Sequence, residues 1–202
     1  MTDDEIPELR NLVCAAPVIE EMLPVFTRFS SFRKLQRVIG LVLRFVNNTR
    51  QKDPKKRCKE ASVTILEMRA AMLTIVRVIQ LSEYEEDIQR IQEKVRCKDI
   101  ENLSPIYENG LLRVGGRLQH SDLSYDRKHQ LILPQKNSVV KLLVRAIHEE
   151  NAHVGPQGVV AAIRQRFWIT NTRSVARQIT RNCVTCFKAR PREIEQQMGS
   201  LP

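Results

Sequence analysis

The sequence predicts a mainly α-helical protein with a small β element between two helical parts. Apolar residues recur every three or four positions through much of residues 28–98 and 138–182, which is typical of amphipathic helices. Residues 101–134 instead contain short apolar stretches with glycines, which favour strands and turns. Two close pairs of histidines and cysteines lie near the C-terminus. Together these observations predict a helical N-terminal half, a short β ribbon and a three-helix C-terminal domain.

The first 27 residues are acidic. They carry six acidic residues, one basic residue and three prolines. We expect residues 1–27 to be a poorly ordered acidic lead-in with one short helix at most, because prolines and repelling charges disfavour a packed core. A helical region is expected to follow over residues 28–98.

The first long helix is predicted from about Ser30 to Asn47. Ser30 and Ser31 are candidate N-caps, and Asn47 with Asn48 ends the helix before a basic linker around Pro54. Its apolar stripe repeats at steps of three and four residues: Phe29, Phe32, Leu35, Ile39, Val42 and Phe45.

The second helix is predicted to begin near Thr64. Thr64 and Glu67 fit a capping box, and Ser82 and Glu85 fit a second one that starts a third helix. The second helix carries Ile65, Met68, Met72, Ile75 and Ile79 on one face, and the third carries Tyr84, Ile88, Ile91 and Val95. We expect the three helices to pack as a small bundle without catalytic residues.

Residues 99–134 predict a short β element. Two short apolar stretches, GLLRVGGRL and QLILP, flank the polar segment QHSDLSYDRKH. Glycines in such stretches are typical of turns or bulges. We therefore expect a ribbon or a few strands that lead into Pro134.

Three further helices are expected in residues 135–192. The first has an apolar stripe that runs into His148, and Gly155-Pro156 then breaks the chain and opens the second. The third spans roughly Thr172 to Asn182. The stripes of the first two helices comprise Val139, Val140, Leu143, Val144 and Ile147, and then Val159, Val160, Ile163 and Phe167.

His148, His153, Cys183 and Cys186 form the pattern H-x4-H-x29-C-x2-C. Two thiolates and two neutral imidazoles suit zinc, and four such donors make a closed tetrahedral site with no position for a substrate. Residues five apart on a helix point about 140° away from each other, so the two histidines cannot both lie within one helix and share an ion. We predict His148 on the last turn of a helix, His153 in the loop past it, and one structural Zn²⁺.

The alternative is that core histidines and a redox-active CxxC pair occur together by accident. Such pairs serve redox chemistry beside a βαβ pattern, and none surrounds this pair. Three short helices are too small a core to stand alone, so we expect the metal to supply folding free energy and the metal-free domain to be largely unfolded. Trp168 is expected to fill core space beside the metal.

Basic residues form two blocks. The chain has a net charge of +10, with +10 in residues 28–59, +9 in residues 134–192 and −5 in residues 1–27. A basic zinc module is typical of a nucleic-acid binder, although basic residues that only solubilise a protein are the alternative. For Lys52–Lys59 a solvated loop, a localisation patch and a phosphate contact all stay open.

Seven basic residues in the C-terminal block are candidate phosphate contacts, without proof that they share a face. They are Arg164, Arg166, Arg173, Arg177, Arg181, Lys188 and Arg190.

The remaining cysteines and the absence of long apolar runs bear on location. Cys14, Cys58 and Cys97 are scattered, which indicates a reducing compartment rather than a disulfide framework. No run of 18 apolar residues occurs, and the start MTDDEIPEL is not a secretory signal. We expect an intracellular protein, with the nucleus left open, and neither a membrane nor a small-molecule substrate as partner.

The stretch HEENAHVGPQGVVAAIRQRFWI followed by CVTCFKARP resembles the His-His-Cys-Cys zinc-binding domain of retroelement integrases, most closely the Bel/Pao type of LTR retrotransposon. ENGLLRVGGRLQHSDLSYDRKHQLILP is similar to the segment that precedes this domain in Bel/Pao polyproteins. FSSFRKLQRVIGLVLRFVNN resembles the region between the RNase H part and the integrase. The resemblance covers nearly the whole chain from about Thr27.

The resemblance implies that His148, His153, Cys183 and Cys186 are the zinc ligands of a helix-turn-helix-like integrase domain over residues 135–192. Residues 28–98 would correspond to a pre-integrase linker, and residues 193–202 to a tail that leads toward a catalytic core. In related integrases this domain supports multimer assembly and contacts the DNA ends of the element. DNA, a second copy of the chain and an integrase catalytic core are therefore the implied partners.

The sequence departs from the family where the catalytic core would begin, at MGSLP. No trio of carboxylates can be assigned to that core, so we expect a non-catalytic zinc-binding protein: a fragment, a decayed copy or a domesticated piece of a polyprotein. A protein–protein interaction or oligomerisation module without nucleic-acid binding is the alternative. A third interpretation makes Cys183 a nucleophile activated by His148, but a thiolate bound to zinc is not free for that chemistry.

Overall fold

The computed structural model describes residues 16–53, 55, 57–58, 60–97, 100–116, 121–190 and 199. Most of these residues are helical, and four short strands form one sheet. The helices of the N-terminal half are α2 (Ala16–Thr27), α3 (Phe32–Arg50), α4 (Ile65–Glu83) and α5 (Glu85–Gln92), followed by the 3₁₀ turn η3 (Glu101–Leu103). The remaining elements are β1 (Ile106–Glu108), β2 (Leu111–Arg113), α6 (Tyr125–Lys128), β3 (Leu131–Leu133), α7 (Ser138–Glu150), α8 (Pro156–Ile163), β4 (Phe167–Ile169), α9 (Thr172–Arg181) and α10 (Val184–Ala189).

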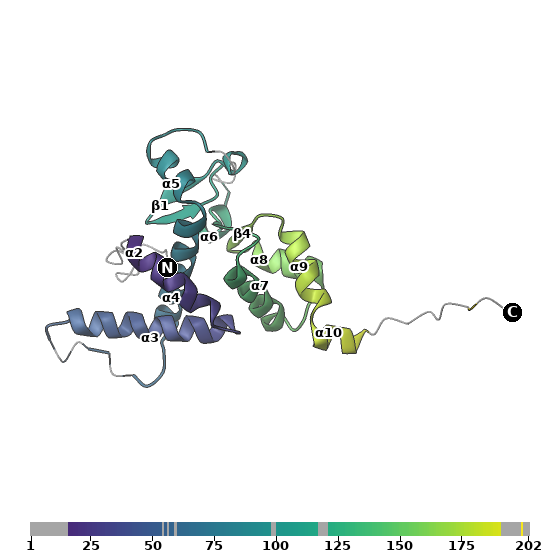
Figure 1. Ribbon diagram of the computed structural model, residues 1–202, viewed down its shortest axis with the longest axis horizontal. Helices are drawn as coiled ribbons and strands as arrows, with labels where there is room; N and C mark the ends of the chain where they lie inside the picture. The colour runs from purple at the N-terminus through teal and green to yellow at the C-terminus, as the bar shows by residue number, and fades with distance from the viewer. Residues whose placement is uncertain are drawn as a thin grey trace.

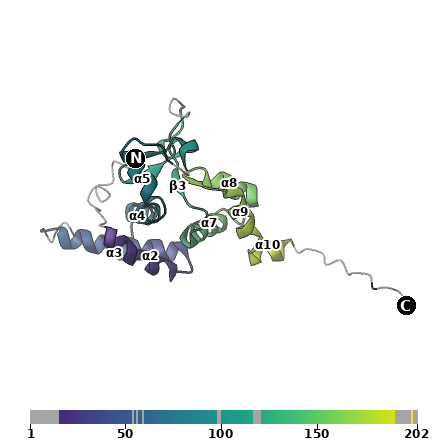
Figure 2. The same ribbon diagram turned by 45° about the horizontal axis from the view of Figure 1, so that its top comes forward.

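Helix α4 is the centre of the N-terminal half. It contacts α2, α3 and α5 as well as strands β2 and β3. Figures 1 and 2 show α2 and α3 beside it, with α5 near its far end. The predicted capping box at its start is confirmed: Thr64 Oγ1 accepts from the Glu67 amide, and the Glu67 carboxylate accepts from the Thr64 amide.

The apolar stripe predicted for the first long helix is only partly correct. Phe32, Leu35 and Ile39 are buried, whereas Val42 is 47% and Phe45 67% exposed. The buried face continues through Leu43 and Arg44 instead, because the Arg44 side chain forms an ion pair with Glu67 of α4. The helix also continues past Asn47 to Arg50.

The predicted bundle of three helices is wrong in its third member. Ser82 lies within α4, where its hydroxyl donates to the Ile79 carbonyl, and Tyr84 is the N-cap of α5 without a side-chain cap. Helix α5 contacts α4 and strand β1. Tyr84 and Ile88 are buried with strand residues, whereas Val95 lies past the helix end and is exposed.

The sheet has the order β1-β2-β3-β4. Strands β1 and β2 form an antiparallel hairpin whose turn residues Asn109 and Gly110 have φ values of +51° and +73°, as a tight two-residue turn requires. Strand β3 is antiparallel to β2 and parallel to β4. A β element was predicted at residues 99–134, but β4 comes from residues 167–169, where Phe167 was assigned to a helix.

Gln80 of α4 joins the helix to the middle of this sheet. Its side chain is 1% exposed. The amide nitrogen donates to the Leu112 and Ile132 carbonyls at 2.8 Å each, and the amide oxygen accepts from the Leu112 N–H at 2.8 Å. Since β2 and β3 share a single register pair, Arg113 with Leu131, Gln80 supplies hydrogen bonds that the ladder lacks.

We therefore expect Gln80→Leu to lower the free energy of unfolding by about 2–4 kcal/mol, because it leaves buried backbone groups of both strands without partners. Urea unfolding at neutral pH measures the loss. Exposed Gln178 on α9 is a matched control, and Gln178→Leu is expected to change stability by less than about 0.5 kcal/mol. Equal small effects of both substitutions would contradict the role given to Gln80.

One hydrophobic core runs through both helical parts of the chain. It includes Phe26 of α2, Leu35 of α3, Ile75 of α4, Val144 of α7 and Ile179 of α9. Helix α7 also contacts α2 and α3. The C-terminal helices thus pack against a core larger than their own. None of the described helices is long and apolar enough to cross a lipid bilayer.

Candidate metal centre

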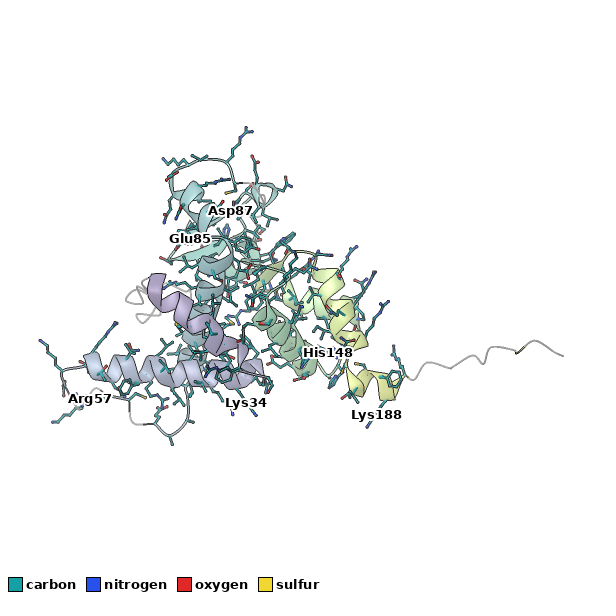
Figure 3. All side chains as sticks on the ribbon, in the orientation of Figure 1. Lys34, Arg57, Glu85, Asp87, His148 and Lys188 are labelled. Carbon is teal, nitrogen blue, oxygen red and sulfur yellow. The ribbon has the colours of Figure 1, made fainter. Side chains whose placement is uncertain are left out.

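The four predicted ligands come together in the structure. His148 is on the last turn of α7 and His153 lies in the loop past it, as predicted. Cys183 is the N-cap residue of α10 and Cys186 lies in its first turn. The four donor atoms all lie within 4.8 Å of one another. Figure 3 labels His148 at the end of α7 near α10.

The distances between the donors fit one tetrahedral ion. His148 Nε2 lies 3.2 Å from His153 Nδ1 and 3.2 Å from Cys186 Sγ, and Cys183 Sγ lies 3.2 Å from His153 Nδ1. A tetrahedral zinc ion separates two nitrogen and two sulfur donors by about 3.3–3.8 Å. Small side-chain movements therefore suffice to seat an ion, and the cluster is consistent with one structural zinc.

His148 is held in the orientation that a ligand needs. Its Nδ1 lies 3.1 Å from the Val154 carbonyl oxygen, which can only accept a hydrogen bond. Nδ1 must therefore carry the proton, and the lone pair of Nε2 points to the cluster. Burial lowers the pKa of His148, which favours the neutral imidazole that binds metals.

A reversal of the chain brings His153 back toward His148. Ala152 and His153 have φ values of +52° and +57°, both in the left-handed region. The His153 amide donates to the His148 carbonyl at 3.0 Å, which closes the turn. Two histidines that would diverge on a continuous helix thus face one ion.

Because the backbone at Ala152 is left-handed, we expect an alanine-to-glycine substitution there to stabilise the protein, whereas the same substitution within a helix destabilises it. Ala152→Gly is expected to raise the free energy of unfolding by about 0.5–1 kcal/mol, because glycine adopts positive φ without strain. Ala161→Gly, at an exposed position within α8, is expected to lower it by about 1 kcal/mol. Urea unfolding of the zinc-loaded proteins tests both, and destabilisation by Ala152→Gly would contradict the turn geometry.

The two thiols have different environments. Burial raises the pKa of the Cys183 thiol, but hydrogen bonds with Cys186 and Thr185 outweigh it and the net pKa falls. Burial and the neighbouring Cys183 raise the pKa of Cys186. The thiolate therefore forms more easily at Cys183 than at Cys186, and a cation between the two sulfurs favours both thiolates.

The seven candidate phosphate contacts lie on several elements and have different surroundings. Arg173, Arg177 and Arg181 are exposed and lie four residues apart on α9, so they form one stripe. Arg181 and Arg190 line a hollow of about 360 Å³ with Cys186 and Phe187. Lys188 is exposed on α10, the last of the described helices, and is labelled in Figure 3.

Arg164 and Arg166 have other surroundings. The Arg164 guanidinium lies 5.7 Å from the centre of the Trp168 ring. Trp168 itself is half-buried in β4, which corrects the expectation that it fills the core beside the metal. Arg166 lies 3.7 Å from the Asp126 carboxylate, in a charged cluster that the sequence did not reveal. No local motif marks that cluster, because its members come from separate elements.

Residues 135–192 match the family model described as the integrase zinc binding domain. The matched range contains all four clustered donors. No curated protein and no solved structure matches the chain.

Proposed function

We propose that residues 135–192 form an integrase-type module in which His148, His153, Cys183 and Cys186 bind one structural zinc ion and a basic surface contacts DNA. The family match and the convergence of four nitrogen and sulfur donors support the zinc assignment. A four-donor site has no open position, so the module would act without catalysis. The resemblance to Bel/Pao polyproteins supports an origin in such an element, and DNA contact would favour a nuclear location.

The stripe of Arg173, Arg177 and Arg181 on α9 is the observation that carries the DNA proposal. All three side chains are exposed, and among the described residues none forms an ion pair with a carboxylate. Successive members lie about 6 Å apart along the helix axis, so they form a line of positive charge that can lie along a phosphate backbone. Zinc would fix α10, with Lys188 and Arg190, at the end of this stripe.

Binding of labelled duplex DNA to the zinc-loaded chain, followed by fluorescence anisotropy from 50 to 200 mM salt, tests the proposal. Each lost phosphate contact lowers the slope of log affinity against log salt by about 0.9. Arg177→Gln with Arg181→Gln should therefore lower it by about 2. The matched control is Lys34→Gln with Arg37→Gln, which removes the same charge from exposed positions on α3. Affinity independent of salt, or equal losses in both variants, would contradict α9 as the contact surface.

A second candidate function is self-association through α10. Val184 is 65% and Phe187 57% exposed beside the metal cluster. Exposed apolar residues of this kind are typical of interaction surfaces. Sedimentation velocity separates the two functions: oligomers that Val184→Ser with Phe187→Ser disperses, together with no DNA binding, would favour this candidate.

A further inference from the structure

One carboxylate in the middle of the molecule is shared by three arginines. Asp126 of α6 lies 3.5 Å from Arg69 of α4, 3.4 Å from Arg113 of β2 and 3.7 Å from Arg166, just before β4. Figure 1 shows α6 between α4 and β4. Three guanidinium groups thus lie beside one carboxylate, which holds them close together.

The three arginines differ in how firmly they are held. Arg113 is 2% exposed, donates to the His129 carbonyl at 2.8 Å and lies over the Tyr125 ring, so its position is fixed. The side chains of Arg69 and Arg166 are 25% and 42% exposed, and both approach the same oxygen, Asp126 Oδ2. Their distances exceed the 2.7–2.9 Å or so of a strong charge-assisted hydrogen bond. One carboxylate oxygen thus has two partly exposed cations beside it.

Both partly exposed arginines line a cavity. Arg69, Asp126 and Arg166 line a space of about 410 Å³ together with the apolar side chains of Ile65, Met68 and Met72. The cavity is open to solvent, since its lining residue Ile65 is 87% exposed, so an anion can reach both guanidinium groups. Arginine also presents a planar fork of donors that matches the oxygens of a phosphate group.

We propose that this cavity binds a tetrahedral oxyanion, with Arg69 and Arg166 as a phosphate clamp and Asp126 keeping the two guanidinium groups in place. The bound anion would be a second counter-charge beside the guanidinium groups of Arg69 and Arg166. The site lies on α4, α6 and the segment before β4, whereas the arginine stripe lies on α9. It joins α4 to the segment that leads into β4, and a bound phosphate would therefore link the two helical parts.

Titration of the zinc-loaded full chain with inorganic phosphate, against sodium chloride at equal ionic strength, tests the site. We expect the arginine Nε–H signals of Arg69 and Arg166 to shift saturably in nuclear magnetic resonance spectra with phosphate and not with chloride. Arg166→Gln should weaken phosphate binding at least tenfold. Its side chain is 42% exposed and its contact to Asp126 is long, so this variant is expected to fold, which circular dichroism checks. Arg166→Lys, which keeps the charge without the fork, should bind with intermediate affinity.

Arg145→Gln, at an exposed position on α7, removes the same charge outside the cavity and should leave phosphate binding unchanged. Thymidylyl-thymidine, which has a phosphodiester and no terminal phosphate, distinguishes the source of the anion. Shifts with this compound as well identify a phosphodiester site, and shifts with inorganic phosphate alone identify a site for free phosphate or a monoester. Unshifted Arg166, equal shifts in chloride, or full binding by the folded Arg166→Gln variant would overturn the proposal.

Discussion

Removing zinc, or replacing Cys186 with serine, is expected to lower the free energy of unfolding by about 5 kcal/mol, which corresponds to a drop of about 10–20 °C in Tm for a chain of this size. The physical reason lies in α10. This helix has no buried residue, and its main contact is with α9. Its attachment would depend on the two cysteines at its start. The left-handed turn at Ala152 and His153 would likewise lose the bond between His153 and zinc that holds it.

The structure also predicts which parts survive without the ion. Helices α7, α8 and α9 contribute Val144, Ile163 and Ile179 to the core that includes α3 and α4. We therefore expect the zinc-free protein to lose α10 and the loop at residues 151–155 while α7 to α9 stay largely helical. This outcome differs from the extensive unfolding that the sequence alone suggested, because the core is shared.

Calorimetry and circular dichroism with and without a chelator measure both effects. Cys58→Ser is the matched control, since it makes the same chemical change in the loop after α3, and its Tm should stay within about 2 °C of the parent protein. A Cys186→Ser variant that retains one zinc with unchanged affinity and unchanged Tm would contradict the assignment of Cys186.

The second large effect is expected at the buried ion pair between α3 and α4. Arg44 and Glu67 are 9% and 10% exposed at their side chains, and Arg44 Nε donates to Glu67 Oε1 at 2.6 Å. Arg44 also donates to the Glu60 and Ser62 carbonyls at 2.6 Å. Glu67→Gln leaves the buried guanidinium without its counter-charge, and we expect a loss of about 3–5 kcal/mol.

The pH dependence follows from the same pair. The hydrogen bond from Arg44 lowers the pKa of Glu67 from about 4.5 to about 2. Because the folded pKa is the lower one, the stabilisation is present above about pH 4.5 and is lost as the pH falls toward 2. A shift of this size corresponds to about 3 kcal/mol.

Urea unfolding of the zinc-free protein at pH 7, 4.5 and 3 isolates the contribution of the Glu67 carboxylate to stability, because no metal is released as the pH falls. The difference in stability between the parent protein and Glu67→Gln should shrink as the pH falls. Glu93→Gln, at an exposed position just after α5, is the control and should leave both the stability and its pH dependence unchanged. A difference that stays constant from pH 7 to 3 would show that the carboxylate of Glu67 is not the source of the effect.

The sequence predicts features whose determinants are local. The capping box of Thr64 and Glu67 depends on residues three apart, and the spacing of His148 and His153 requires a helix end between them. Chemistry then groups the two histidines with Cys183 and Cys186, because few functions need two thiols and two imidazoles in two close pairs.

Features set by distant partners could not be predicted in this way. From Ile39 the apolar stripe of α3 could continue through Val42 and Phe45 or through Leu43, and the choice depends on Glu67 of another helix, which draws Arg44 inward. Strand β4 has three residues, too few for a periodic pattern, and exists because β3 lies beside it. The cluster around Asp126 likewise has no local signal.

The most direct test of the central claim is zinc K-edge X-ray absorption spectroscopy of the purified full chain, with the metal content measured on the same sample. The account predicts one zinc ion per chain with two sulfur neighbours at about 2.3 Å and two nitrogen neighbours at about 2.0 Å. A coordination shell of oxygen and nitrogen without sulfur, or protein that folds fully and binds no zinc, would contradict it.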